Sequence, residues 1–311
     1  MRRLRYGALT AALLTALVAG CTMGGGSGTD SGRETRRSDT GAVLAVKIDN
    51  VAASRPQTGL GAADVVYVEQ VEGGLSRLMA VYATRLPEVV GPVRSARESD
   101  LELLRQFGDP TLAFSGAQRK LLPLIDAAPL RPEPPGEASG AYFRDRDRPM
   151  PHNLFLRPKK LMDSVGGLPA LAETGFRFGA APGGGTPQAE RTVRFPAARY
   201  TFTWSGRQRA WLVTMDGTPD RTTDGKTLAP ATVVVQYVRV RESRFHDVLG
   251  SNSPYTETVG SGKADVLRDG RVHRVRWERE SAQDGTEFTT ADGKRMTFAS
   301  GQVWVLLVAA R

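Results

Sequence analysis

The single cysteine, Cys21, sets the first limit on how this chain can fold. A chain with one cysteine forms no intramolecular disulfide, so its stability must come from a packed apolar core. About 270 residues follow position 41, which is enough chain for one or two such cores. The fold is therefore to be sought in the apolar patterning of the sequence.

The segment before Cys21 has the layout of a secretory signal. Three arginines within the first five residues precede an apolar run over residues 6–18. The tetrad Val18-Ala19-Gly20-Cys21 forms a lipobox, whose cysteine thiol accepts a diacylglyceryl group before cleavage. We expect residues 1–20 to be a lipoprotein signal peptide and Cys21 to carry the lipid. An uncleaved anchor helix is the alternative, but the apolar run is shorter than the roughly 20 residues of a membrane span.

The mature chain that this cleavage would produce has a moderate positive charge. Of the 42 lysines and arginines, three lie in the signal, which leaves 39 against 33 acidic residues and a formal charge of +6. A basic surface suits anionic lipid head groups, phosphorylated wall polymers or nucleic acid. The base composition of the genome is an alternative cause of an arginine-rich chain. Aromatic residues are not interleaved with the basic clusters, as oligonucleotide binding would require, so nucleic acid is not expected as a partner.

Composition divides the rest of the chain into a tether and two folded parts. Residues 21–41 are rich in glycine, serine, threonine and charged residues, and they are predicted to be a lipidated flexible tether. The folded parts are expected at residues 42–180 and 188–311, with the glycine-rich segment 179–187 as the boundary loop.

Strand and helix patterns are mixed in the N-terminal part. Short apolar runs predict buried strands at residues 43–48, 65–71, 78–83 and 111–114. Apolar residues with helical spacing predict a helix over residues 98–107, and a second helix is predicted from Ala117 to Asp126. This mixture indicates an α/β (α+β) N-terminal domain.

Short β-like segments dominate the C-terminal part. Candidate strands cover residues 192–195, 200–204, 210–215, 232–240, 264–267, 272–277 and 302–308. Turn signals of the Asp-Gly type separate several of them, as at Asp216-Gly217 and Asp269-Gly270. A smaller, β-rich and mainly antiparallel C-terminal domain is therefore expected.

The segment Gly91–Arg97 (GPVRSAR) carries the first candidate site. Arg94, Ser95 and Arg97 stand between a predicted strand and a predicted helix, on a connection of the kind that often presents ligand-binding groups. Guanidinium groups bind phosphate or carboxylate through two parallel hydrogen bonds. Ser115 lies on a second strand-to-helix connection, where the free amides of the following helix would favour an anion. If the two strands are neighbours, the two connections converge.

An architectural role is the alternative for the two arginines of this segment, through ion pairs that hold the domain together. The acids available to them are Asp64, Glu69, Glu72 and Asp100. His152 and Asn153 form a second candidate, after an arginine-rich segment, residues 144–148. Imidazole titrates near neutral pH, so His152 suits acid or base chemistry, but a structural histidine beside a turn asparagine fits the same residues.

Several motifs of known chemistry are incomplete. Gly260-Ser261-Gly262-Lys263 resembles the end of a P-loop, but Glu257 stands where the first glycine is needed and Ala264 where a hydroxyl should bind magnesium. The three histidines are widely separated, so no zinc-binding spacing exists. No serine lies in a G-x-S-x-G elbow. No metal and no cofactor is therefore expected.

Ordered blocks of sequence span nearly the whole mature chain. In the first part they are Val46–Asn50 (VKIDN), Ala53–Leu60 (ASRPQTGL), Ala63–Val81 (ADVVYVEQVEGGLSRLMAV), Gly91–Arg97 and Pro151–Phe155 (PHNLF). In the second part they are Val234–Tyr237 (VVQY), Val259–Lys263 (VGSGK), Trp277–Glu280 (WERE) and Gly301–Val305 (GQVWV). These blocks resemble the YerB-like lipoproteins, bacterial envelope proteins built from a two-part domain of unknown function. The resemblance implies an α/β N-terminal part and a smaller β-rich C-terminal part, and it supplies no catalytic residues.

The leading hypothesis is a membrane-anchored binding protein on the extracytoplasmic face of the cell membrane. It would hold an anionic envelope ligand, bearing phosphate or carboxylate, or a protein partner. The candidate ligand-binding residues are Asp49, Asn50, Arg55, Glu69, Arg77, Arg94, Ser95, Arg97, Ser115, His152 and Asn153.

Two other hypotheses stay open. A phosphotransferase or hydrolase acting on phosphorylated envelope material would use carboxylates to hold a divalent metal and arginines to neutralise phosphoryl charge. A structural protein would dock a partner at the edge of its C-terminal sheet. The sequence leaves open whether the chain is an enzyme, and it does not identify the ligand, the partner or the oligomeric state.

Overall fold

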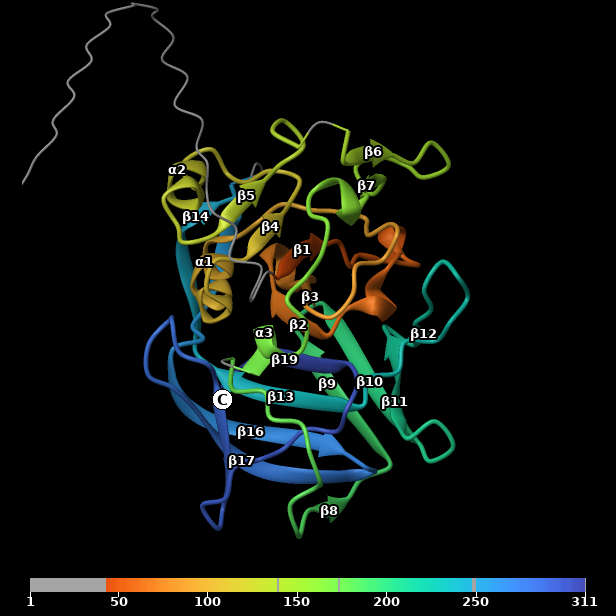
Figure 1. The fold of residues 1–311 in the computed structure, drawn as a ribbon, viewed down its shortest axis with the longest axis vertical. Coiled ribbons are helices and arrows are strands. Elements are labelled where there is room, and N and C mark those ends of the chain that lie inside the picture. The colour runs from red at the N-terminus through yellow and green to blue at the C-terminus, as the bar shows by residue number, and fades with distance from the viewer. Residues whose placement is uncertain (1–42, 139, 173, 248–249, 311) are drawn as a thin grey trace, which may run out of the picture. The chain divides into compact units, whose positions relative to one another are not determined.

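The structure, a computed structural model, describes residues 43–138, 140–172, 174–247 and 250–310. A single mixed sheet of 11 strands runs through this described part (Figure 1). Its strands are β1 (Leu44–Ile48), β2 (Val65–Gln70), β3 (Ser76–Tyr82), β4 (Thr111–Ala113), β5 (Arg131–Glu133), β8 (Thr186–Pro187), β13 (Thr232–Val238), β16 (Gly260–Arg268), β17 (Arg271–Arg279), β18 (Glu287–Thr290) and β19 (Val303–Ala309). Their order is β18-β17-β16-β13-β19-β2-β3-β1-β4-β5, and β8 pairs with β17.

The last strand joins the two halves of the chain. β19 pairs in parallel with β13 on one side and with β2 on the other. Its side chains alternate between two cores, Trp304 and Leu306 on one face and Val303 and Val305 on the other. A strand buried on both faces must be apolar throughout, which explains its sequence. Residues Ser38–Arg311 thus form one compact unit, and the boundaries at residues 180 and 188 stay a prediction.

A second sheet covers one face of the large sheet. It has the order β12-β11-β10-β9, with β9 (Glu190–Phe195), β10 (Ala198–Ser205), β11 (Ala210–Met215) and β12 (Thr218–Pro219). Tyr200 and Phe202 of β10 meet Trp304 edge to face, with ring centroids 6.3 and 6.1 Å apart. Such aromatic contacts, together with the apolar area that they bury, hold the two sheets together.

The other face carries short helices and a hairpin. The helices are α1 (Glu98–Leu104), α2 (Leu122–Asp126) and α3 (Pro169–Ala172), and the hairpin is β14 (Val240–His246) with β15 (Asn252–Thr256).

A further hairpin joins β6 (Tyr142–Arg144) to β7 (Leu154–Leu156). Single 3-10 turns lie at Ala52–Ser54, Leu60–Ala62, Glu72–Gly74, Arg105–Phe107 and Pro158–Lys160.

The helix content differs from the predicted fold class. The helix predicted over residues 98–107 forms as α1 and a 3-10 turn, but the one predicted over residues 117–126 begins only at Leu122. Pro123 lies in the first turn of α2, and a proline further inside a helix would clash with the preceding turn. Since α1, α2 and α3 have only 7, 5 and 4 residues, the described chain as a whole is largely β and is not clearly of the α/β class that was predicted for its N-terminal part.

The predicted C-terminal strands are found with small shifts of their ends. Asp216 and Gly217 have φ angles of 51° and 90°, and Asp269 and Gly270 have 51° and 70°. Two successive left-handed residues form the tight turn that matches strand twist, as the Asp-Gly pairs predicted. The β-rich character of this half is confirmed.

Most strands of the large sheet end at the same edge of it, together with the connections that follow them. Seven strands run in the same direction, whereas β3 and β16 run against them; the seven are β1, β2, β4, β5, β13, β17 and β19. The carboxyl ends of the seven strands therefore lie at one edge, which we call the carboxyl edge. Ligands of open sheets bind beyond the carboxyl ends of parallel strands, so this edge is where a site is expected.

Candidate functional site

Asp49 lies at the centre of a charged cluster on the carboxyl edge. It follows β1 directly and its side chain is fully buried. His152 Nδ1 lies 2.7 Å from Asp49 Oδ2, and Arg94 Nε lies 3.0 Å from the same oxygen. Arg77 Nη2 is 4.0 Å from Oδ1, and the backbone amide of Asn50 donates to Oδ1 at 2.9 Å. One buried carboxylate thus meets three basic side chains from distant parts of the sequence.

The contact between Arg94 and Asp49 is made by Nε and leaves the two Nη groups of the arginine without a partner in the described residues. Although Nε lies close to the carboxylate, its N–H does not point along a hydrogen bond to any acceptor in the described residues. The side chain is 24% exposed. Asp49 therefore fixes the position of the Arg94 charge without using up the directed hydrogen bonds of the guanidinium.

Asn50 and Arg55 connect this cluster to the second sheet. Asn50 Nδ2 donates to Tyr200 Oη at 2.5 Å and to Ser76 Oγ at 3.1 Å. Arg55 Nη2 donates to the Asn50 carbonyl at 2.9 Å and to Asp216 Oδ2 at 2.8 Å. Both predicted site residues lie beside Asp49, but their polar groups are engaged within the protein.

Glu69 is the partner of a buried lysine that sequence reasoning did not select. Lys47 Nζ donates to Asp100 Oδ1 at 2.6 Å and also contacts Glu69 Oε1. Ser99 Oγ donates to the other Glu69 oxygen at 3.0 Å. Burial lowers the pKa of Lys47 to about 8, against the opposing charge of Asp100. The sequence gave no signal of this role. Side chains alternate faces along a strand, so a single lysine in an apolar run is equally compatible with a position on an exposed face.

Arg97 has the architectural role that was the alternative for both arginines. Its Nε and Nη2 donate to Glu72 Oε1 and Oε2 at 2.7 and 2.6 Å. Burial opposes the ionisation of Glu72, but the hydrogen bonds and charge of Arg97 outweigh it and hold the pKa of Glu72 at about 2. A guanidinium in such a two-pronged pair has few donors left for a ligand.

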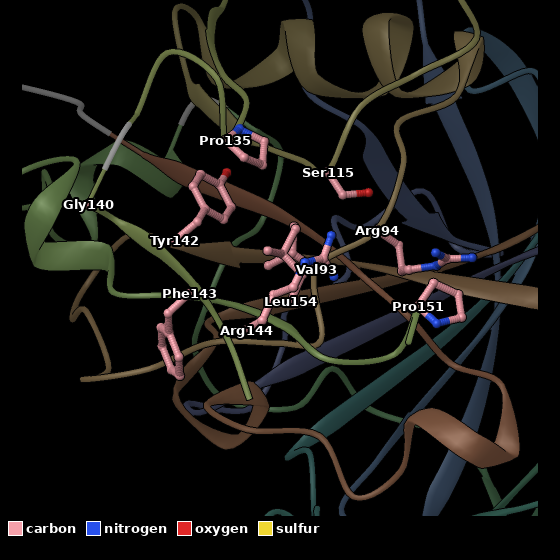
Figure 2. A pocket seen from close by; sticks show the side chains of 10 residues that line it. All are labelled: Val93, Arg94, Ser115, Pro135, Gly140, Tyr142, Phe143, Arg144, Pro151 and Leu154. Carbon is pink, nitrogen blue, oxygen red and sulfur yellow. The ribbon is translucent and has the colours of Figure 1, made fainter. Parts of the chain in front are cut away.

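A cavity of about 440 Å³ lies beside Arg94, at the carboxyl ends of β4 and β5 (Figure 2). It is lined by Val93, Arg94, Ser115, Pro135, Gly140, Tyr142, Phe143, Arg144, Pro151 and Leu154. None of these lining residues is acidic. Figure 2 shows Tyr142 and Pro135 at one side of the cavity and Arg94 and Pro151 at the other. Two guanidinium groups and one serine hydroxyl therefore face a hollow without a competing carboxylate in its lining.

The two strand connections meet at this cavity, although β1 lies between β3 and β4 and the two strands are not the neighbours on which the expectation depended. The backbone amide of Ser115 donates to the Arg94 carbonyl at 3.0 Å, and Ser95 Oγ lies 3.4 Å from Ser115 Oγ. Ser95 itself does not line the cavity. The anion site expected at the amides of a helix after Ser115 is wrong, because the chain there is irregular until Leu122.

Asn153 holds the second arginine of the cavity. Its side chain is buried, and its Oδ1 accepts a hydrogen bond from Arg144 Nη1 at 2.8 Å. Asn153 Nδ2 in turn donates to the Asp145 carbonyl at 3.2 Å. Sequence reasoning noted the arginine-rich segment but did not single out Arg144. The available signal was its place two residues after Tyr142 in β6, which puts both side chains on one face.

The predictions about the signal peptide, a membrane span and a metal site concern residues or features that the structure describes only in part. Cys21 and the predicted signal peptide lie outside the described residues. Among the helices of residues 43–310 that are described, none is long and apolar enough to cross a bilayer. The same part of the chain holds no group of three or more His, Cys, Asp or Glu side chains arranged to hold a metal ion.

Comparisons with known proteins agree with a two-part chain. The N-terminal domain of "Protein of unknown function (DUF3048)" matches residues 29–170, and the DUF3048 C-terminal domain matches residues 191–305. The chain is 26% identical over 275 residues to "Putative lipoprotein YerB" of Bacillus subtilis (strain 168), covering 85% of this chain and 80% of that protein. The crystal structure of the YerB protein from Bacillus subtilis matches with a TM-score of 0.71 at 20% identity, over 87% of this chain and 91% of that one. The chain therefore belongs to the DUF3048 family of YerB-like lipoproteins.

Proposed function

We propose that this lipoprotein is anchored through a lipidated Cys21 on the extracytoplasmic face of the membrane and binds an anionic envelope ligand in the cavity beside Arg94. The observation that carries the proposal is the cavity lining, in which Arg94, Arg144 and Ser115 supply donors and no acid is present. Guanidinium groups suit phosphate and carboxylate, so the ligand is expected to carry one of these groups.

The positions of both arginines support binding. Arg94 is held by the buried Asp49 and Arg144 by the buried Asn153. A side chain that is already in place loses less conformational freedom when the ligand arrives, so more of the interaction appears as affinity. The outward donors of the two arginines are then available for two oxygens of one anionic group or for two neighbouring groups.

Exchanging Arg144 for glutamine is expected to weaken anion binding by about ten- to a hundredfold, the equivalent of one charged hydrogen bond of roughly 1.5–3 kcal/mol. The measurement is the thermal shift of residues 38–311 with inorganic pyrophosphate and with glycerol phosphate as probes. At one hundred times Kd, a bound probe stabilises the wild type by about 2.7 kcal/mol. The Arg144→Gln shift should be much smaller at the same probe concentration.

Arg146→Gln is the matched control, because it removes the same charge two residues away from an exposed side chain that does not line the cavity. Arg94→Gln is a second test from the other side of the cavity. If Arg144→Gln and Arg146→Gln reduce the shift equally, the probe binds by net charge alone and the cavity is not the site.

A hydrolase or phosphotransferase is the second candidate, favoured by the contact between His152 and Asp49. A carboxylate that holds one imidazole nitrogen orients the other, as in general bases of many hydrolases. Pro151, the neighbour of His152, lines the cavity. Release of orthophosphate during the pyrophosphate titration, abolished by His152→Gln while the thermal shift persists, would favour this candidate over simple binding.

The lipid anchor is tested on the whole protein in its producing cell. Mass spectrometry of the membrane fraction is expected to show a chain that begins at Cys21 and carries a diacylglyceryl group. The Cys21→Ser variant removes the only thiol, so it should lack the lipid and keep residues 1–20. An unmodified Cys21 with the first 20 residues attached would contradict the anchored location.

A further inference from the structure

A second hollow lies further along the carboxyl edge, where β13 and β19 end and β16 begins. Its volume is about 850 Å³, within the range of ligand pockets. Its walls are residues 191–194 of β9, residues 237–239 at the end of β13 and just beyond it, residues 308–310 at the end of β19 and just beyond it, and residues 260–263 of β16. We call this hollow the basic groove.

The charges of the basic groove are mostly positive and mostly uncompensated. Arg191 pairs with Asp265 at 2.6 Å, so its charge is balanced. Arg194 and Lys263 are exposed and make no close ion pair within the described residues, and Arg239 comes only within 4.0 Å of Glu257. Glu257, the one acid of the lining, is itself paired with Arg241 at 2.8 Å. Arg194 and Lys263 therefore face the groove without an ion pair in the described residues, and Arg239 has only a long one.

Apolar side chains make up slightly more than half of the surface of the basic groove. Partly or fully exposed side chains of Tyr237, Val308 and Ala309 contribute to it, together with the buried Val193 of one core and the buried Trp277 of the other. Apolar side chains that remain wet at the base of a hollow favour a ligand that covers them with an apolar group.

Local structure keeps this surface in place. Trp277 Nε1 donates to the Tyr237 carbonyl at 2.9 Å, which holds the indole across the end of β13. A Cβ on Gly262 would lie 2.7 Å from Trp277 Nε1 and 3.0 Å from the Tyr237 carbonyl. Only glycine therefore lets β16 pass so close to the indole. The Gly-Ser-Gly-Lys segment that failed as a P-loop thus has a structural place in the groove wall.

We propose that the basic groove binds a single anionic phospholipid, with an acyl chain on the apolar surface and the phosphate among Arg194, Arg239 and Lys263. A small inorganic anion would leave the apolar surface in water. A neutral apolar ligand would leave Arg194 and Lys263 without a counter-charge. A phospholipid with net negative charge satisfies both parts of the groove, and this site is separate from the cavity beside Arg94.

Isothermal titration of residues 38–311 with dihexanoyl phosphatidylglycerol, kept below its critical micelle concentration, tests the proposal. One molecule is expected to bind per chain, at least tenfold more tightly than the phosphatidylcholine with the same chains and than glycerol phosphate. The double variant Arg194→Glu/Lys263→Glu should weaken binding at least tenfold. Ala309→Trp fills the groove from an exposed position and should weaken it by a similar factor.

Lys159→Glu/Lys160→Glu is the matched control, since it makes the same change in net charge at two exposed residues outside the groove. It should leave the affinity for phosphatidylglycerol within twofold of the wild type. Equal weakening by the control pair, equal binding of phosphatidylcholine or of glycerol phosphate, or an absence of saturable binding to the correctly folded wild type would each overturn the proposal. None of these results would change the expectation for pyrophosphate and Arg144.

Discussion

Replacing Lys47 with methionine is expected to lower the free energy of unfolding by about 3–5 kcal/mol. The Lys47 side chain is fully buried between Glu69 and Asp100, which are themselves 1% and 0% exposed. Methionine fills a similar volume but leaves two buried carboxylates without a positive partner. Removal of one member of a buried ionic group costs this much because the remaining charge has lost both water and its counter-ion.

Urea titration followed by tryptophan fluorescence measures the effect. Lys159→Met removes an exposed lysine and should change the free energy by less than about 0.5 kcal/mol. The triple variant Lys47→Met/Glu69→Gln/Asp100→Asn removes all three charges and keeps acceptors for Ser99 and for the amide of Arg97, so it should recover much of the loss. A cost for Lys47→Met no larger than that for Lys159→Met would contradict the buried ionic group.

Asp220→Asn is expected to stabilise the protein by about 2–4 kcal/mol at pH 8 and to have little effect near pH 4. Asp220 is 4% exposed, and its Oδ2 has no hydrogen-bond partner among the described residues. Burial raises the pKa of Asp220 to about 7, although the charge of Arg55 acts in the opposite direction. The native carboxyl is thus costly to ionise.

The direction of the pH dependence follows from proton binding. Below about pH 7 the folded protein keeps the Asp220 proton, whereas the unfolded chain releases it near pH 4. Between these values the folded state binds more protons, so this group makes stability fall as pH rises, by about 1.4 kcal/mol per unit. Asparagine cannot ionise and removes the slope.

Urea titrations at pH 4, 6 and 8 compare the wild type with Asp220→Asn. Asp109→Asn, at an exposed carboxylate, is the control and should show no such divergence. A constant difference between wild type and Asp220→Asn at all three pH values would contradict a raised pKa for Asp220.

Local patterns were sufficient to predict most strands and turns. Alternating apolar residues and Asp-Gly pairs act within a few positions of the chain, so β9–β11 and the turns at Asp216 and Asp269 were found with small errors. The helix predicted from Ala117 begins only at Leu122 for an equally local reason, the proline at position 123.

The sequence named several residues that the structure brings together, while their role in binding stays a prediction. Asp49, Arg77, Arg94 and His152 do meet, and Arg94 and Ser115 do line the cavity. Arg97 belongs to an architectural pair with Glu72 instead. Whether an arginine faces a ligand or an acid depends on which segment packs beside it, and residue type alone does not contain that information.

The sequence by itself determined the family, through its ordered blocks, and most of the strand segments and turns, because a strand or a turn depends on residues close together in the chain. The export signal at Cys21 stays a prediction. The tertiary structure decided that β19 separates β2 from β13 and that His152 meets Asp49, 103 residues away. Such contacts are set by strand order and burial across the whole fold. The cavity and the basic groove exist only because that order brings so many strand ends to one edge.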